Sequence, residues 1–450
     1  MLTVNEGTLR EGALEIVRVL RDAGYQALWV GGCVRDDLLG IPPKDYDIAT
    51  DVDPEAVLDL FASHEGSEAR FVGEAFGVVR VSLSCGVYEV ARFREEGGYQ
   101  DGRHPSSVRA STAERDALRR DFTVNGMFYD PIDERVIDYV GGQADLDAKV
   151  IRTIGEPSER FGEDHLRMLR AIRFASRLNW PIQDETFSAI VDLAGQITRI
   201  SQERVRDELI LILTEGGAPQ GIRSLIDTGL AGHLLPEILD MDGVPQPPQF
   251  HPEGDVLTHT MIMLGLLRDP NLELAFGVLL HDVGKPSTYE VLDRIRFNNH
   301  VKVGAEMAEA ICCRLRMSND QTEHIRRLVA DHHRFASVHE MRQSTLKRFL
   351  RTPRFEDHLE LHRLDCLSSN RKLESYRFSR DALGTLKPDE IRPDRLITGD
   401  DLIAAGYPPG PAFKLALGAV EDQQLEGKLE TAEAALAVAT AILDQDSSGS

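Results

Sequence analysis

The chain has 450 residues, of which 42% are hydrophobic, and a formal net charge of −23 at pH 7. This length predicts about three domains, and no apolar run reaches the roughly 18 residues that a membrane-spanning helix needs. The negative charge argues against indiscriminate nucleic-acid binding, because affinity for a phosphate backbone comes mainly from clustered Lys and Arg.

Two segments depart from this acidic average. Residues 92–120 hold seven arginines against five acidic residues, and residues 152–177 hold six against four, which would focus a polyanion onto one part of the surface. Residues 1–20 lack the apolar core of a signal peptide. The five cysteines are odd in number and lack C-x-x-C spacing. We therefore expect a cytoplasmic protein with reduced thiols.

Residues 1 to about 150 alternate between helical and extended patterns. In chain order we expect a helix through Leu20, a strand at Ala27–Val30, a turn at Gly31-Gly32, a helix over Val34–Leu39, a strand carrying Asp45 and Asp47, a helix opened by Asp53-Pro54, and strands at Val78–Leu83 and Val87–Phe93. This alternation predicts an α/β domain around a small mixed or antiparallel sheet.

The glycine turn and the second strand together suggest a nucleotide site. Backbone N–H groups at the helix start after Gly31-Gly32 attract phosphate. Asp45 and Asp47 are two residues apart in the expected strand, so their side chains leave the same face and can hold divalent metal together. Metal ions held in this way lower the pKa of an attacking hydroxyl and neutralise a leaving pyrophosphate. For these two residues alone, the alternative is a solvated turn.

From about residue 158 to 240 the pattern is helical. The expected helices are Glu163–Leu178, Asp184–Leu193, Gln202–Leu213 and Pro219–Gly229. In the first of them, four polar residues recur every three positions, namely Asp164, Arg167, Arg170 and Arg173. A carboxylate beside a guanidinium presents an acceptor and donors that can read the edge of a nucleotide base. The alternative is a salt-bridged amphipathic helix.

A second constellation follows a proline-rich connector at residues 243–249, where we expect a new domain to begin. Ten of the fourteen histidines lie between His251 and His362. His259, His281, Asp282 and Asp365 occur in the order H…HD…D, which resembles the HD phosphohydrolases, and two imidazoles with two carboxylates can enclose a divalent metal. His300 and the pair His332-His333 suggest a second metal, with Lys285 near a bound phosphate. The alternative is a helical domain whose histidines are satisfied in the core or whose metal site has decayed.

Four sequence blocks, taken together in order, closely resemble the class II nucleotidyltransferases, the family of tRNA CCA-adding enzymes and bacterial poly(A) polymerases. The blocks are Gly31-Gly32-Cys33-Val34-Arg35-Asp36, Asp45-Tyr46-Asp47-Ile48-Ala49-Thr50, Arg119 to Asn125, and Glu163 to Phe174. The resemblance implies an α+β chain: a polymerase-β-like head with a small mixed sheet, followed by all-α neck and body, HD and tail domains. We place these domains at residues 1–150, 151–243, 244–385 and 386–450.

The resemblance also implies roles for individual residues. Asp45 and Asp47 match the catalytic Mg²⁺ ligands, Gly32 and Arg35 match the turn that contacts the triphosphate, and Arg120 and Asp121 match the ribose-side contacts. Asp164 and Arg167 match the pair that hydrogen-bonds the incoming base, and Glu163 matches the residue that holds Arg167. Arg170 and Arg173 match residues that reach phosphates. Glu89 is a candidate third carboxylate. Residues 97–105 resemble a flexible loop that helps to switch the pocket from C to A.

The function implied is addition of CCA, or of its terminal A, to tRNA 3′ ends from CTP and ATP without a nucleic-acid template, with an HD phosphohydrolase side activity. Poly(A) polymerase is the closest alternative. In an alternative of another class, the HD domain is the active enzyme and the head an RNA-binding module. We expect Mg²⁺ in the head and Mn, Ni, Co or a similar metal in the HD domain, RNA 3′ ends as substrate, a separate CC-adding enzyme as a candidate partner, and no membrane.

Overall fold

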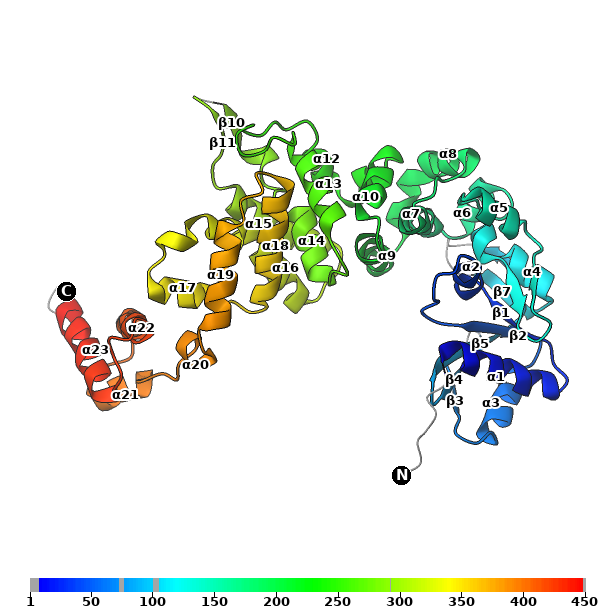
Figure 1. The fold of residues 1–450 in the computed structure, drawn as a ribbon, viewed down its shortest axis with the longest axis horizontal. Helices are drawn as coiled ribbons and strands as arrows, with labels where there is room; N and C mark the ends of the chain where they lie inside the picture. Colours follow the sequence, from blue (N-terminus) through cyan, green and yellow to red (C-terminus); the bar gives the residue numbers. More distant parts are fainter. Residues whose placement is uncertain (1–7, 73–76, 100–104, 292, 448–450) are drawn as a thin grey trace. The chain divides into compact units, whose positions relative to one another are not determined.

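A computed structural model describes residues 8–72, 77–99, 105–291 and 293–447 (Figure 1). The chain divides into two compact units, Met1–Leu239 and Asp240–Ser450. Within the described ranges, every helix is too short or too polar to cross a membrane.

The first unit is built on a mixed sheet whose described strands run in the order β3-β4-β5-β2-β1-β8-β9. These strands are β1 (Ala27–Val30), β2 (Asp47–Thr50), β3 (Glu68–Phe71), β4 (Val78–Leu83), β5 (Gly86–Arg92), β8 (Phe128–Asp130) and β9 (Arg135–Ile137). β1 pairs antiparallel with β2, whereas β2 pairs parallel with β5. The predicted mixed sheet is confirmed.

Eleven helices are described for this unit in addition to α1 (Leu9–Asp22). They are α2 (Gly32–Leu38), α3 (Pro54–Ala62), α4 (Ala113–Leu118), α5 (Gly142–Ala148), α6 (Pro157–Glu163), α7 (Arg167–Leu178), α8 (Asp184–Leu193), α9 (Gln202–Thr214), α10 (Ala218–Asp227), α11 (Leu230–Leu234) and α12 (Pro236–Leu239). The short 3₁₀ turns η2 (Thr123–Asn125) and η3 (Ala194–Arg199) complete it.

Side-chain alternation along the strands divides the core between the two faces of the sheet. Trp29 and Ile48 pack with α1 and α3 on one face, and Leu28 and Ala49 pack with α4 on the other. Because Asp47 precedes Ile48 by one residue, its side chain leaves the sheet on the α4 face. The carboxylate of Asp47 therefore lies on the face of the sheet that is not covered by α1 and α3.

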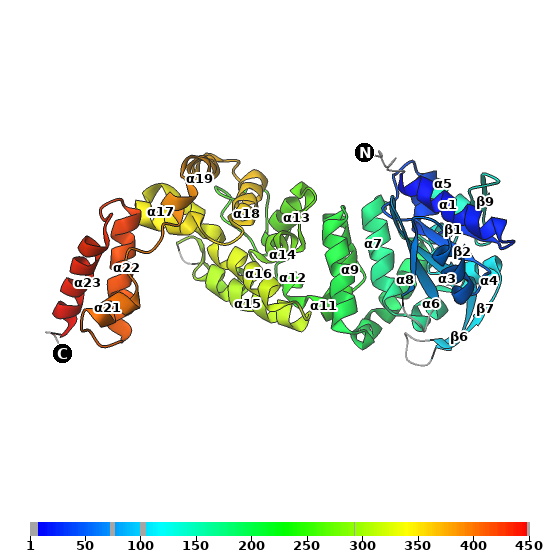
Figure 2. The same ribbon diagram turned by 90° about the horizontal axis from the view of Figure 1, so that it is seen from below.

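The helices after the sheet differ from the prediction at one point that matters for the site. The expected helix from Glu163 to Leu178 is interrupted: α6 ends at Glu163, Asp164 has an extended backbone with φ −148° and ψ 105°, and α7 begins at Arg167. The helical spacing predicted for Asp164 is wrong, although it holds for Arg167 and Arg170. α7 packs beside α9 and α10 (Figures 1 and 2).

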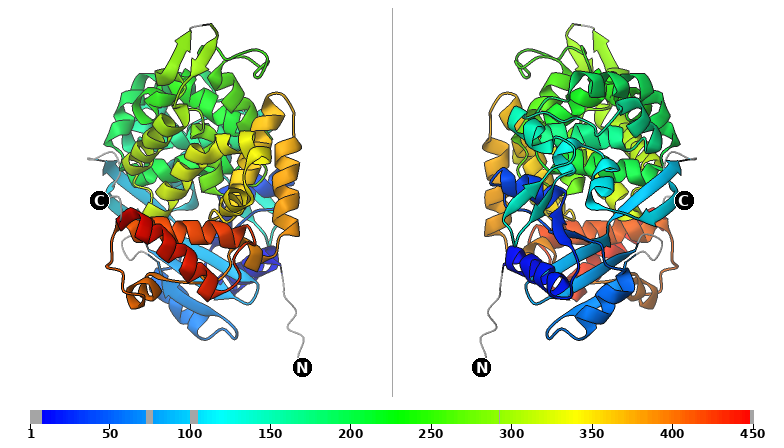
Figure 3. Two further views of the ribbon diagram at one scale, coloured as in Figure 1. Left: turned by 90° about the vertical axis from the view of Figure 1, so that its left-hand side faces the viewer. Right: turned by 90° about the vertical axis from the view of Figure 1, so that its right-hand side faces the viewer.

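The second unit is helical apart from the hairpin of β10 (Tyr289–Val291) and β11 (Ile295–Phe297). Its helices are α13 (Val256–Leu266), α14 (Leu272–Leu280), η4 (Pro286–Thr288), α15 (His300–Arg314), α16 (Asn319–Asp331), η5 (His332–Glu340), α17 (Gln343–Leu350), α18 (Phe355–Ser368), α19 (Glu374–Thr385), α20 (Pro388–Ile391), α21 (Gly399–Ala404), α22 (Pro411–Leu425) and α23 (Ala432–Ser447). α22 and α23 lie side by side and share an apolar core with α21 (Figure 3).

Residues 243–249, expected as a stiff connector, are part of the second unit. Pro245 forms an isolated antiparallel bridge with Asp255, and the side chain of Gln246 is buried. The segment therefore packs against the domain that it precedes.

Candidate functional site

The backbone of the glycine turn lies close to an arginine from a distant segment of the chain. Gly31 has φ +81° and ψ −130°, a conformation that L side chains rarely adopt, and a Cβ built there would lie 3.2 Å from the Nη1 atom of Arg120. The Gly31 N–H donates to the carbonyl oxygen of Met127. The turn therefore fixes the start of α2 beside Arg120.

Three carboxylates meet at the edge of this turn. Asp47 is the first residue of β2, opposite Val30 on β1 and Glu89 on β5. Asp47 is exposed in its cavity, but desolvation by the surrounding protein, followed by repulsion from Asp45 and Glu89, raises its pKa to about 6 against the opposing attraction of Arg120. Asp45 lies just before the strand, so the expectation that both aspartates belong to one strand is wrong for Asp45.

Both aspartates nevertheless line one cavity of about 320 Å³. Its lining includes the predicted residues Gly32, Arg35, Asp45, Asp47, Arg120, Asp121, Arg170 and Arg173, together with Gly31, Asp36, Lys44, Asn125, Phe174, Arg177 and Glu215. The sequence blocks that carried the family resemblance therefore meet in space. Lys44 and Glu215, which sequence reasoning missed, join through an ion pair of 3.0 Å.

The arginines of this cavity are held by buried acids. Arg35 donates to Asp36 and to the Asn125 side chain, and Arg170 pairs with Asp121 at 2.6 Å. Burial alone would raise the pKa of Asp121, but Arg170, Arg167 and the hydrogen bond from the Phe122 N–H together outweigh burial and lower this pKa to about 2. The ionised Asp121 carboxylate in turn orients the Arg170 guanidinium.

A second cavity, of about 290 Å³, adjoins the first through a shared wall. Arg120, Asp121 and Arg170 line both cavities, and the second adds Arg119, Asp164, Leu166, Arg167 and Arg204. We call these three common residues the shared wall. Asp45 and Asp47, the predicted metal ligands, line the first of these adjoining cavities, and the predicted base-reading pair Asp164 and Arg167 lines the second.

Each member of the base-reading pair is held by its own partners. Arg204 on α9 donates through Nη1 and Nη2 to the two carboxylate oxygens of Asp164, at 3.2 and 2.6 Å. Arg167 pairs with Glu163, as expected, and donates to the carbonyl oxygens of Arg160 and Arg119. Sequence reasoning missed Arg204 because its partner lies 40 residues away. Only the extended backbone at Asp164 turns that carboxylate toward α9.

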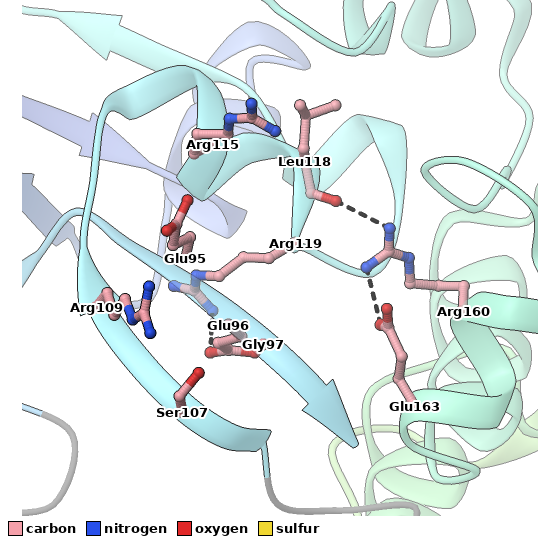
Figure 4. A pocket seen from close by; sticks show the side chains of 10 residues that line it. All are labelled: Glu95, Glu96, Gly97, Ser107, Arg109, Arg115, Leu118, Arg119, Arg160 and Glu163. Carbon is pink, nitrogen blue, oxygen red and sulfur yellow. Dashed lines mark hydrogen bonds and ion pairs between the residues drawn. The ribbon is translucent and has the colours of Figure 1, made fainter. Parts of the chain in front are cut away.

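A third polar cavity, of about 400 Å³, is lined by Glu163, Arg119 and Arg160 among others (Figure 4). Arg160 donates to the carbonyl oxygen of Leu118 and to Glu163, and Arg119 pairs with Glu96 on β6 (Arg94–Tyr99). β6 and β7 (Pro105–Ala110) form an antiparallel hairpin. Residues 97–99 and 105 of the predicted loop are therefore strand, and its residues 100–104 lie outside the described residues.

The second unit brings the H…HD…D residues together. His259 on α13 lies 3.3 Å from Asp365 on α18, measured from Nε2 to Oδ1. His281 follows α14 and lies 3.1 Å from Asp282, measured from Nε2 to Oδ2. His259, His281 and Asp282 offer ligand atoms that lie within 4.8 Å of one another. The predicted ligands thus converge from separate helices.

The predicted additional histidines join the same centre. The Nε2 atoms of His300 and His332 lie 3.8 and 3.7 Å from the Oδ1 atom of Asp282. His300, His332 and His333 form a further group of ligand atoms within 4.8 Å. Asp282 therefore stands between two groups of imidazoles.

The donor set fits a divalent metal. His281, His300 and His332 each donate through Nδ1 to a backbone carbonyl oxygen, which leaves Nε2 as the metal-facing atom. These Nε2 atoms, with His259 Nε2 and Asp282 Oδ1, are buried and have no hydrogen-bond partner in the described part of the chain. Buried polar atoms without partners are costly. A shared metal would satisfy them.

The flanking lysine is also buried. Lys285 Nζ lies 2.6 Å from Asp282 Oδ2 and donates at 2.6 Å to the Gln246 amide oxygen. Burial alone would raise the pKa of Asp282, but His281 and Lys285 hold this pKa well below its usual range. Asp282 therefore stays ionised as a ligand should.

Comparisons with known proteins match three segments of the chain. Family models match at residues 27–152, "Poly A polymerase head domain"; at 179–241, "Probable RNA and SrmB- binding site of polymerase A"; and at 256–352, "HD domain". The carboxylate and glycine motifs lie in the first match, and His259, His281 and Asp282 lie in the third.

Similar proteins carry related names. The CCA-adding enzyme of Bacillus subtilis is 42% identical over 49% of this chain and 55% of its own length, and poly(A) polymerase I of Salmonella typhimurium is 39% identical over 52% of each chain. The matched part thus spans about half the length of these curated relatives. The crystal structure of Bacillus stearothermophilus CCA-adding enzyme in complex with CTP superposes with a TM-score of 0.74 and 25% identity over 98% of both chains.

The family models, the relatives and the fold all converge on one group of proteins. The chain carries a head domain of the poly(A) polymerase type and an HD domain, and it is similar in sequence and fold to CCA-adding enzymes and bacterial poly(A) polymerases.

Proposed function

We propose that this protein adds CCA, or its terminal A, to tRNA 3′ ends by metal-dependent nucleotidyl transfer from CTP and ATP. The observation that carries the proposal is the shared wall, which joins the cavity of Asp45 and Asp47 to the cavity of Asp164 and Arg167. A nucleotide spanning both cavities would place its triphosphate and its base in separate, chemically matched surroundings. The named functions of the relatives support the same reaction.

On the metal side, Asp45 and Asp47 would hold Mg²⁺, and Glu89 offers a third carboxylate beside them. The metal supplies a lowered hydroxyl pKa and neutralises charge on the leaving pyrophosphate. Arg120 and Arg170 line the same cavity and would face the phosphates. The 3′-hydroxyl of the RNA attacks the α-phosphate, and pyrophosphate leaves in line.

On the base side, the two side chains provide a pattern that C and A share. Cytosine and adenine each present an exocyclic amino donor beside a ring-nitrogen acceptor, whereas uracil and guanine present a carbonyl acceptor beside a ring N–H donor. The Asp164 carboxylate accepts, and the Arg167 guanidinium donates. Arg204 and Glu163 hold these two groups in place, so the protein side chains would act as the template.

Incorporation assays on three RNA ends test this proposal with the full-length protein. Purified protein with Mg²⁺, CTP and ATP is offered tRNA lacking CCA, tRNA ending in CC, and oligo(A). Incorporation into the first two substrates marks a CCA-adding enzyme, and incorporation into the second alone marks an A-adding enzyme with a separate CC-adding partner. Extension of oligo(A) favours the alternative, a poly(A) polymerase, and no incorporation on any end contradicts nucleotidyl transfer.

We also propose a phosphohydrolase activity for the HD domain, acting on terminal or 2′,3′-cyclic phosphate at RNA ends. The buried, unpartnered imidazole nitrogens around Asp282 favour it, since they suit Mn, Ni, Co or a similar metal. Lys285 lies beside Asp282 and would contact a phosphate. Metal-dependent release of terminal phosphate, or ring opening of a 2′,3′-cyclic phosphate to a monoester, should disappear in His281→Ala and persist in Asp47→Ala. The reverse pattern would assign the hydrolysis to the head.

These assignments keep the predicted division into head (1–150), neck and body (151–243), HD domain (244–385) and tail (386–450), and we propose that the tail docks RNA. They imply a protein that works in the cytoplasm on tRNA.

A further inference from the structure

We propose that Glu253 is a positioning residue of the HD metal centre, acting through His259. This inference rests on the metal site proposed above and deepens it. Glu253 lies before residue 256, where the HD family match begins, and neither the sequence motif nor the family match includes it.

The contacts single out His259 among the histidines of the centre. Its Nδ1 atom lies 2.6 Å from the Glu253 Oε1 atom, whereas His281, His300 and His332 use Nδ1 to donate to backbone carbonyl oxygens. The Glu253 side chain is 7% exposed and that of His259 is 0% exposed. The Glu253 carboxylate therefore contacts the His259 imidazole where little solvent reaches either group.

This pairing determines which nitrogen of His259 faces the centre. An ionised carboxylate only accepts hydrogen bonds, so the Nδ1 atom beside Glu253 keeps its proton, and a metal bound at the centre would take the lone pair of Nε2. The Nε2 atom points toward Asp365 at 3.3 Å. A carboxylate behind a ligating imidazole also raises the ligand's basicity more than a neutral carbonyl does. His259 should consequently be the strongest imidazole donor of the set.

The surrounding segment is built to keep Glu253 in place. His251 donates a second hydrogen bond to the same Oε1 atom at 2.9 Å, and Pro245 bridges to Asp255 across the segment. Gln246, in the same segment, accepts the bond from Lys285. Residues 245–255 thus supply the outer contacts of both His259 and Lys285.

The test is a titration of the metal-free, full-length protein with Co²⁺ alone, followed by the visible absorption of bound Co²⁺ and by calorimetry. All variants carry Asp47→Asn, which removes a carboxylate ligand from the head. We expect Glu253→Gln to weaken Co²⁺ binding by about 10- to 100-fold. Glu306→Gln, which changes an exposed carboxylate on α15, should bind as the parent does.

The outcomes separate the two levels of the proposal. If the parent binds no Co²⁺, or if His281→Ala binds it unchanged, the metal centre itself is refuted. If the parent binds Co²⁺ and Glu253→Gln binds it equally well, only the role of Glu253 is refuted. His251→Ala tests the segment without removing the carboxylate and should weaken binding less than Glu253→Gln. A folded Glu253→Gln protein, judged by its circular dichroism, excludes a general loss of structure.

Discussion

Asp47 is held in a setting that disfavours its own charge. Desolvation by the surrounding protein and the neighbouring carboxylates Asp45 and Glu89 raise its pKa to about 6, from an ordinary value of 3.8. A metal ion would remove this penalty, because a cation favours the ionised form of a carboxylate. Metal binding at this site would therefore lower the free-energy cost of ionising Asp47.

Without metal, Asp47→Asn should stabilise the protein at pH 8. The native state holds its proton more tightly than the unfolded state, so the wild-type free energy of unfolding falls as pH rises from about 4 to 6 and stays reduced above that. The gain from Asp47→Asn should be present at pH 8 and vanish near pH 4. Denaturant unfolding in EDTA at the two pH values measures it, and equal gains at both would contradict the raised pKa.

With Mg²⁺ present, the same substitution should reduce nucleotide incorporation by about 10²–10³-fold or more, because charge develops where a metal ligand has been removed. Single-turnover incorporation of CTP and ATP measures the loss. Asp51→Asn, an exposed aspartate just beyond β2, is the control.

Arg204→Ala should relax the choice of nucleotide rather than abolish transfer. Without the two hydrogen bonds from Arg204, the Asp164 carboxylate can turn away from the base. We expect selectivity for CTP and ATP over UTP and GTP to fall roughly tenfold, the effect of about 1.4 kcal/mol. Arg206→Ala is the matched control, because Arg206 lies on the same helix and pairs with Asp207. Unchanged selectivity would mean that Asp164 is held by other groups.

At the scale of elements, two features restrict Gly31 to glycine: its positive φ and its close contact with Arg120. Gly31 and Gly40 both have positive φ, but only at Gly31 would an added Cβ meet another residue, the Arg120 guanidinium. The two glycines therefore form a natural pair for separating strain from contact.

Both Gly31→Ala and Gly40→Ala should lower the free energy of unfolding by about 1–3 kcal/mol. Only Gly31→Ala should also slow incorporation, because it displaces Arg120 from the cavity. Urea unfolding and incorporation rates measured on the two variants test this. Equal rates would show that the turn acts through stability alone.

Local patterns predicted about half of the described elements of the first unit, and β1, β4 and α8 have the expected bounds. Two features of the site were beyond them. The kink at Asp164 interrupts a strongly helical pattern, because its carboxylate binds Arg204 and the Leu166 N–H instead of continuing a helix face. The pairing of Asp47 with Glu89 follows from a parallel register that no local spacing reveals. Likewise, the H…HD…D motif indicated a metal, but Glu253 and Gln246 are found only through the folding of residues 245–255.

At the scale of the whole molecule, the two compact units each have their own apolar cores, and the candidate metal ligands of the HD domain all lie in the second unit. Thermal unfolding of the full chain should therefore occur in more than one transition. Co²⁺ at about 100 times its dissociation constant should stabilise the unit that binds it by about 2.7 kcal/mol. Calorimetry of His281→Ala should lose the Co²⁺ response of one transition and keep the other transition unchanged. A single transition that shifts as a whole would contradict independent units.

The common boundary formed by Arg120, Asp121 and Arg170 has a kinetic consequence. A mismatched base that sits poorly against Asp164 must tilt the nucleotide, and this boundary transmits the tilt to the reacting phosphorus. Errors should accordingly be rejected mainly through slow turnover of bound nucleotide, with little loss of affinity, so that fidelity and speed would be tuned by the same three side chains.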